Sequence, residues 1–230
     1  LIHDEIELLF QKYLRMKSNL LRLAYFSLLF SLLYSCHSKK DSSESIEKSE
    51  PTLFTLLPSE ETGINFINKV QNSKEFNIFK YRNFYNGGGV AIGDINNDGL
   101  SDVFLTGNME PNKLYLNKGG LKFEDISEAA GIAGNKPWST GVVMADINND
   151  GLLDIYVSNA GNMEGNNHDN DLFINNGNGT FTERAHEFNL AETGFSTHAS
   201  FFDYDKDGDL DAYILNNSNI PVSSLGYAEQ

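Results

Sequence analysis

Cysteine is almost absent from this chain: Cys36 is the one thiol in 230 residues, so no intrachain disulfide can stabilise the fold. Basic residues are also scarce, with 17 Lys and Arg against 32 Asp and Glu, which gives a formal net charge of −15. Nucleic acid is therefore disfavoured as a partner, because its phosphates need a basic face. The acidic balance instead suits a protein that binds divalent cations or stays soluble through self-repulsion.

A long membrane-spanning run is missing too. The apolar stretch at residues 23–34 follows a basic start and is too short for a comfortable membrane span, but it fits a secretory signal. It ends in Leu33-Tyr-Ser-Cys36, which resembles the lipobox of bacterial lipoproteins, whose cysteine becomes the lipidated first residue of the mature chain. Lipidation of Cys36 would place the protein at the outer membrane or cell surface. An uncleaved membrane anchor with an incidental cysteine is the alternative.

The chain thus divides into three predicted parts. Residues 1–36 are expected to be an upstream extension and a signal helix that starts at Met16, with residues 1–15 either upstream sequence or a real N-terminal extension. Residues 37–51 contain one apolar residue, Ile46, and predict a disordered tether. Residues 52–230 are expected to hold the folded domain.

One acidic loop of nine residues occurs three times, beginning at Asp94, Asp146 and Asp203. Each copy has a glycine at its sixth position, carboxylate or amide side chains at positions 1, 3, 5 and 9, and a carbonyl available at position 7. Calcium favours such hard oxygens around a tight turn. The predicted ligands are Asp94, Asn96, Asp98, Leu100 and Asp102, then Asp146, Asn148, Asp150, Leu152 and Asp154, then Asp203, Asp205, Asp207, Asp209 and Asp211.

The loop is not an EF-hand. An EF-hand needs a glutamate at its twelfth position, but the corresponding residues here are Leu105, Val157 and Ile214, inside predicted strands. Metal-free hairpin turns are the alternative interpretation of Asp-Asn-Gly loops, but three copies with every ligand position filled favour Ca²⁺. Magnesium is the weaker candidate, because it demands stricter octahedral geometry.

Short apolar runs surround each loop in the same order. Gly89-Val-Ala-Ile-Gly-Asp94 matches Gly141-Val-Val-Met-Ala-Asp146 and His198-Ala-Ser-Phe-Phe-Asp203, and one period carries four predicted strands. A four-stranded unit that repeats at intervals of roughly 50 residues predicts an all-β fold, a β-propeller with about two and a half blades. Residues 53–64 echo residues 123–132 and predict the last strand of another blade. We expect the chain to be the N-terminal piece of a longer protein.

These phrases resemble the FG-GAP or VCBS repeat family, whose blades are similar to those of the integrin alpha-subunit propeller. The resemblance rests on Gly-Val-Ala-Ile-Gly-Asp-Ile-Asn-Asn-Asp-Gly, Asn-Lys-Leu-Tyr-Leu-Asn-Lys-Gly-Gly and Phe-Glu-Asp-Ile-Ser-Glu-Ala-Ala-Gly-Ile, and it covers residues 52–220. It implies a ring of about seven blades with calcium in several loops. Among relatives, the chain is most similar to bacterial surface lipoproteins whose propeller precedes a domain shared with cartilage acidic protein. The third copy departs at His198, where the others have glycine, and at Asp209, which adds charge.

The pattern predicts a calcium-binding scaffold for adhesion or protein interaction at the cell surface, with a protein or glycan ligand, and not an enzyme. A propeller-framed polysaccharide-processing enzyme and an assembly module for a neighbouring protein are the alternatives. The insertion at residues 159–170, with His168 and Asp169, is either a binding loop or a solvated variable loop. Trp138 either stacks on sugar or packs in the core. No arrangement of catalytic residues stands out.

Overall fold

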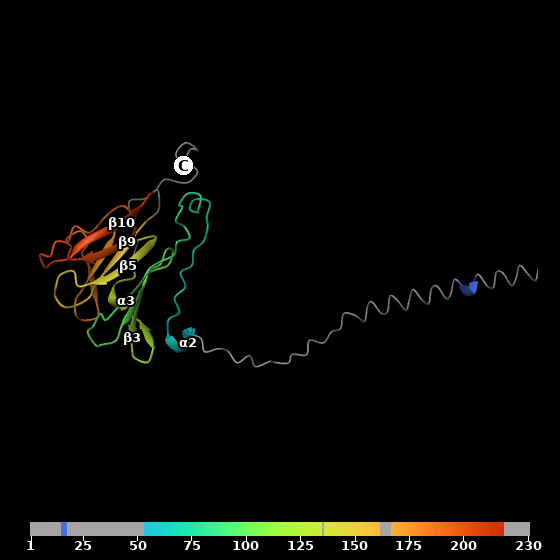
Figure 1. Ribbon diagram of the computed structural model, residues 1–230, viewed down its shortest axis with the longest axis horizontal. Helices are drawn as coiled ribbons and strands as arrows, with labels where there is room; N and C mark the ends of the chain where they lie inside the picture. Colours follow the sequence, from blue (N-terminus) through green and yellow to red (C-terminus); the bar gives the residue numbers. More distant parts are fainter. Residues whose placement is uncertain (1–14, 18–52, 135, 162–166, 219–230) are drawn as a thin grey trace, which may run out of the picture. The chain divides into compact units, whose positions relative to one another are not determined.

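The computed structural model describes residues 15–17, 53–134, 136–161 and 167–218 (Figure 1). The chain divides into two units, residues 1–55 and 56–230, and all the strands belong to the second. Of the predicted signal segment, only Arg15–Lys17 is described, and it is helical. The predictions for Cys36 and for the tether at residues 37–51 lie outside the described residues. No helix of the described part has the length and apolarity needed to cross a membrane.

The first sheet is a four-stranded antiparallel meander. Its strands are β1 (Val90–Gly93), β2 (Asp102–Leu105), β3 (Lys113–Asn117) and β4 (Phe123–Asp125), hydrogen-bonded in chain order. The first acidic loop is the connection between β1 and β2, where Gly93 pairs with Asp102. The loop therefore connects the adjacent ends of two paired strands, which brings its first and ninth residues close together.

The second sheet repeats this arrangement. It consists of β5 (Ser139–Ala145), β6 (Asp154–Asn159), β7 (Asp171–Asn175) and β8 (Phe181–Glu183), and the second acidic loop joins β5 to β6. A third sheet pairs β9 (Phe195–Phe202) with β10 (Asp211–Asn217) around the third loop. The prediction of an all-β partial propeller with four-stranded blades is confirmed.

The second sheet is covered on both faces. One apolar cluster joins the first sheet to the second and includes Phe104, Leu114, Ile155 and Phe173. Another joins the second sheet to the third, around Tyr156, Leu172, Ile174 and Ala199. Every residue of β6 and β7 is buried, and the middle of each strand, residues 155–157 and 172–174, is apolar on both faces rather than alternating. The sheets therefore pack face to face, as successive blades do.

Glycines in or next to the first strand of a sheet allow neighbouring sheets to approach. The strand β5 lies between β1 and β9, as the labels in Figure 1 show for β5 and β9. A Cβ atom added at Gly89 would lie 2.7 Å from the carbonyl oxygen of Thr140, and one at Gly141 would be equally crowded by the carbonyl oxygen of Thr197. The recurring glycine of the sequence motif is thus required by close packing of blades. His198 occupies this position in the third copy.

A one-turn helix follows the outer strand of a blade. The helix α3 (Ser127–Ala130) ends at Gly131, whose φ is 75°, and α2 (Ser59–Thr62) ends at Gly63, whose φ is 81°. In both, the left-handed glycine caps the helix C-terminus. The predicted echo between residues 53–64 and 123–132 therefore holds for the helix. The described residues 53–58 form no strand here, but the predicted partner strands belong to another blade, so the strand within residues 53–64 stays a prediction.

Candidate calcium sites in three blade loops

The first acidic loop is closed by its own side chains. Both carboxylate oxygens of Asp94 accept backbone N–H groups, from Asp98 at 3.1 Å and from Gly99 at 2.7 Å. Asn96 accepts from the Asp98 N–H at 3.2 Å, and Asp98 accepts from the Leu100 N–H at 2.8 Å. These bonds curl the chain into a tight loop. Gly99, with a φ of 85°, makes the sharp turn.

The second and third loops repeat these bonds. In the second, Asp146 accepts from Asp150 N at 3.0 Å and from Gly151 N at 2.9 Å. In the third, Asp203 accepts from Asp207 N at 3.2 Å and from Gly208 N at 3.3 Å. The similarity predicted from sequence therefore extends to the hydrogen bonds.

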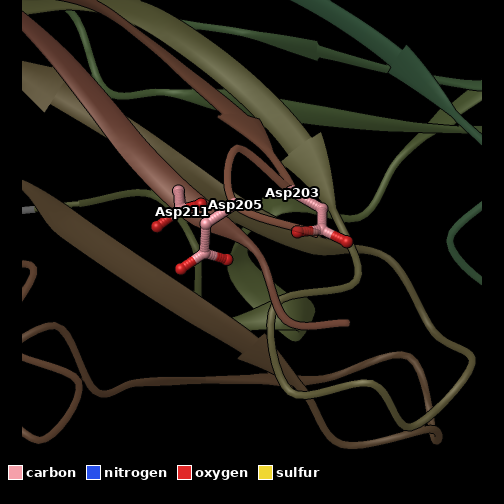
Figure 2. A group of neighbouring side chains, drawn as sticks. All are labelled: Asp203, Asp205 and Asp211. Carbon is pink, nitrogen blue, oxygen red and sulfur yellow. The ribbon is translucent and has the colours of Figure 1, made fainter. Parts of the chain in front are cut away.

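Three carboxylates of the third loop lie closest together. One oxygen from each of Asp203, Asp205 and Asp211 lies within 4.8 Å of the others (Figure 2). The Asp207 carboxylate accepts a hydrogen bond from the Asp209 N–H, and this bond lowers the pKa of Asp207. The nearby Asp207 carboxylate raises the pKa of Asp209. Carboxylates this close together repel one another.

Asp102 and Asp154, at the ninth position, differ from the other ligands because they are fully buried. Asp102 accepts the N–H of Ile95 at 3.0 Å and the N–H of Asn117 at 2.7 Å. Asp154 accepts from Ile147 at 3.0 Å and from Asn175 at 2.9 Å. Desolvation raises the pKa of both carboxyl groups, and the backbone hydrogen bonds oppose that rise. These residues join the loop to the third strand of the blade.

The leucines at the seventh position of the first two loops pack against a neighbouring turn. The side chain of Leu152 lies against Gly177 in the turn between β7 and β8, and that of Leu100 lies against Gly119 in the equivalent turn of the first sheet. Their carbonyls are the predicted ligand atoms. The hydrophobic side chain thus contacts the neighbouring hairpin turn.

The donor set fits a hard divalent cation. Every predicted ligand atom is a carboxylate, amide or carbonyl oxygen, and the third loop gathers a trio of carboxylates on an exposed surface. Calcium accepts six to eight such oxygens in flexible geometry. In the first two loops the residue at position 3 is an asparagine instead of an aspartate. This change reduces the repulsion within the loop and keeps a side-chain oxygen for the cation.

A group of ion pairs connects the inserted loop at residues 159–170 to the second sheet. Lys136 lies 3.1 Å from Asp169 in the inserted loop and 3.0 Å from Asp171 on β7, and His186 lies 3.3 Å from Asp169. Lys136, Asp171 and His186 line a cavity of about 480 Å³. Sequence reasoning noted Asp169 but missed Lys136 and Asp171 as its partners, because nothing in the linear pattern connects them.

Trp138 is a core residue. It is 2% exposed and packs against Phe76, Tyr81 and Phe84, so the packed alternative is confirmed and sugar stacking is wrong.

His198 lines a second cavity, of about 290 Å³, together with Tyr81 and the glycines at 87–89. His168 stacks on Phe195 at 5.3 Å between ring centroids.

Four-stranded meanders that stack face to face, each with an acidic loop between its first two strands, define the blades of a β-propeller. A profile of the FG-GAP-like repeat matches residues 75–157 and 160–214. These matches cover more than half of the 230 residues, and the chain belongs to the FG-GAP-like repeat family. The family predicted from the sequence motifs is confirmed.

Part of the chain is also similar to cartilage acidic protein 1. It is 41% identical to the Xenopus tropicalis protein over 78 residues, which are 34% of this chain and 12% of that protein. It is 38% identical to the Homo sapiens protein over 76 residues, which are 33% of this chain and 12% of that protein. The similarity therefore spans about an eighth of the length of these relatives.

Proposed function

We propose that this chain is part of a calcium-stabilised propeller that presents a binding surface for a protein or glycan outside the cell. The observation that carries the proposal is the third loop, where oxygens of Asp203, Asp205 and Asp211 converge within 4.8 Å. The same hydrogen bonds recur in the first two loops. The acidic loop is repeated in each of the three described sheets. This repetition supports a structural role for the ion, since a catalytic site would need one distinct set of residues.

Calcium would offset the repulsion inside each loop. The carboxylate at position 1 directly follows one strand, the exposed carboxylate at position 5 lies within the loop, and the carboxylate at position 9 begins the next strand. A cation bound among them would lock two strands of the blade together. Extracellular modules bind calcium with dissociation constants of about 10⁻⁴–10⁻³ M, and we expect affinities in this range.

Calorimetry on the full-length protein tests calcium binding. The titration should give heat that saturates in the millimolar range, and Asp150→Ala should remove one site. At 10 mM Ca²⁺, a site with a dissociation constant of 1 mM would stabilise the fold by about 1.4 kcal/mol. Absence of binding heat and of thermal stabilisation at 10 mM Ca²⁺ would refute the proposal. Mg²⁺ at the same concentration is the control for specificity.

We also propose that Cys36 is lipidated and anchors the protein to the outer membrane. The support is the lipobox-like segment Leu33-Tyr-Ser-Cys36. Metabolic labelling with a radioactive fatty acid should mark the wild-type protein in its bacterial host but not Cys36→Ser. Labelling of both proteins, or of neither, would refute lipidation at this residue. A pull-down from outer membranes with the wild-type protein would then separate a protein partner from a glycan ligand.

A further inference from the structure

Two hydrogen-bonded bridges connect the first acidic loop to the second. Asn97, the fourth residue of the first loop, donates from Nδ2 to the carbonyl oxygen of Gly151 at 3.0 Å. Asn175, at the end of β7, donates from Nδ2 to the carbonyl oxygen of Ile95 at 2.8 Å. Neither bond belongs to a strand ladder. The first joins the two loops directly, and the second joins the first loop to β7, whose Asn175 side chain also donates to the Leu153 carbonyl of the second loop.

The first bridge leads to a predicted ligand. The peptide between Gly151 and Leu152 is held at both ends, because its carbonyl accepts from Asn97 and its N–H donates to Asp150 at 2.9 Å. Asn97 lies between the predicted ligands Asn96 and Asp98 and has a φ of 57°. A cation that fixes those two neighbours also fixes Asn97, and through it the position of the Asp150 carboxylate.

The second bridge joins the two buried carboxylates. The N–H of Ile95 donates to Asp102 at 3.0 Å, while its carbonyl accepts from the Asn175 side chain. The backbone N–H of Asn175 donates in turn to Asp154 at 2.9 Å. The ninth-position ligands of the first and second loops are therefore connected through two residues only.

The third loop has no equivalent connection in the described part of the chain. Asn149 occupies the same position in the second loop as Asn97 in the first and has the same φ of 57°. No hydrogen bond between described residues joins Asn149 to the third loop, whereas Asn97 is bonded to Gly151. Among the described residues, a direct bond between loops therefore joins the first to the second and not the second to the third.

We propose that the first and second loops bind Ca²⁺ as a coupled pair, so that occupancy of either loop raises the affinity of the other, while the third loop binds independently. The inference rests on the proposed calcium binding. Ordering one loop removes conformational freedom from its bonded neighbour, so the neighbour loses less entropy when it binds. The effect is reciprocal by thermodynamic linkage. Asn97 and Asn175 act as positioning residues, since neither is a predicted ligand.

Site-resolved titration of the ¹⁵N-labelled full-length protein tests the coupling. The amides of Gly99, Gly151 and Gly208 report the three loops separately, because each donates to the first carboxylate of its own loop. Replacing a first-loop ligand by Asp98→Ala should raise the Ca²⁺ concentration that half-saturates the Gly151 signal about fivefold, as expected for a coupling of one hydrogen bond. The Gly208 midpoint should not change.

A matched pair of variants identifies the bridge. Asn97→Gly removes the amide without strain at a positive φ, and Asn149→Gly makes the same change where no cross-loop bond exists. With Asn97→Gly, the effect of Asp98→Ala on Gly151 should fall to about twofold, because the Asn175 bridge remains. With Asn149→Gly it should stay about fivefold.

The possible outcomes separate the two proposals. A Gly151 midpoint that Asp98→Ala leaves unchanged, or a Gly208 midpoint that moves equally, overturns the coupling while calcium binding stands. Equal effects of Asn97→Gly and Asn149→Gly overturn the assignment of the bridge. If none of the three glycine amides of the wild-type protein responds to millimolar Ca²⁺, the proposed function itself fails.

Discussion

Replacing Asp154 should destabilise the protein even without calcium, whereas replacing Asp150 in the same loop should not. The Asp154 carboxylate is fully buried and accepts two backbone N–H groups, from Ile147 and Asn175. Asp150 is exposed, and the N–H of Leu152 that it accepts can bond to water instead. The two residues are equivalent as predicted ligands but differ in what else they hold.

The magnitude follows from the two hydrogen bonds. With Asp154→Ala, each donor loses its partner at a cost of about 1–3 kcal/mol. Relief from burying the carboxylate, whose pKa desolvation raises, offsets part of this loss. We expect a net decrease of about 2–4 kcal/mol in the free energy of unfolding for Asp154→Ala, against less than about 1 kcal/mol for Asp150→Ala.

Chemical denaturation in EDTA and in 10 mM Ca²⁺ measures both effects. In EDTA, only Asp154→Ala should shift the unfolding midpoint strongly. In calcium, Asp150→Ala should lose an additional increment of about 1.4 kcal/mol relative to the wild type, because one site no longer contributes. Equal losses for the two variants in EDTA would refute the division between a buried, structural ligand and exposed ones.

Three further predictions concern packing and charge. Lys136→Met should lower the free energy of unfolding by about 3 kcal/mol at pH 7, since it leaves the buried Asp171 unpaired, and denaturation that shows no loss would contradict this. Burial raises the pKa of Tyr156 to about 12, so the folded state retains the phenol proton that the unfolded state releases near pH 10. Stability should therefore fall between pH 10 and 12, and Tyr156→Phe should lessen the decrease seen in thermal unfolding. Gly141→Ala should cost about 1–3 kcal/mol, measured by thermal unfolding, because its Cβ would lie under 3.0 Å from Thr197.

The repeat could be predicted because its signals are local. A nine-residue acidic loop between two short apolar runs fixes a turn and two paired strands, and this prediction held in all three copies. The helix-capping turn at Gly63 and Gly131 could also be found by aligning the copies. The strand predicted within residues 53–64 stays a prediction, because a strand needs a partner and its predicted partners belong to another blade.

Contacts between residues far apart in the chain could not be predicted in the same way. Trp138 gave no local sign that it would meet Phe76 and Tyr81, and Lys136 none that it would pair with Asp171. Such contacts depend on how the folded segments pack against one another. Local sequence spacing contains no information about these partners.

The sequence by itself determined the class of fold, the number of acidic loops and the oxygen atoms that they offer, because turn chemistry and strand alternation act over a few residues. Only the tertiary structure decided that Asp154 is buried and Asp150 exposed, and that Asn97 reaches Gly151. Burial and cross-blade hydrogen bonds arise when one sheet covers another. For that reason, loops that read alike in the sequence have different neighbours in the fold.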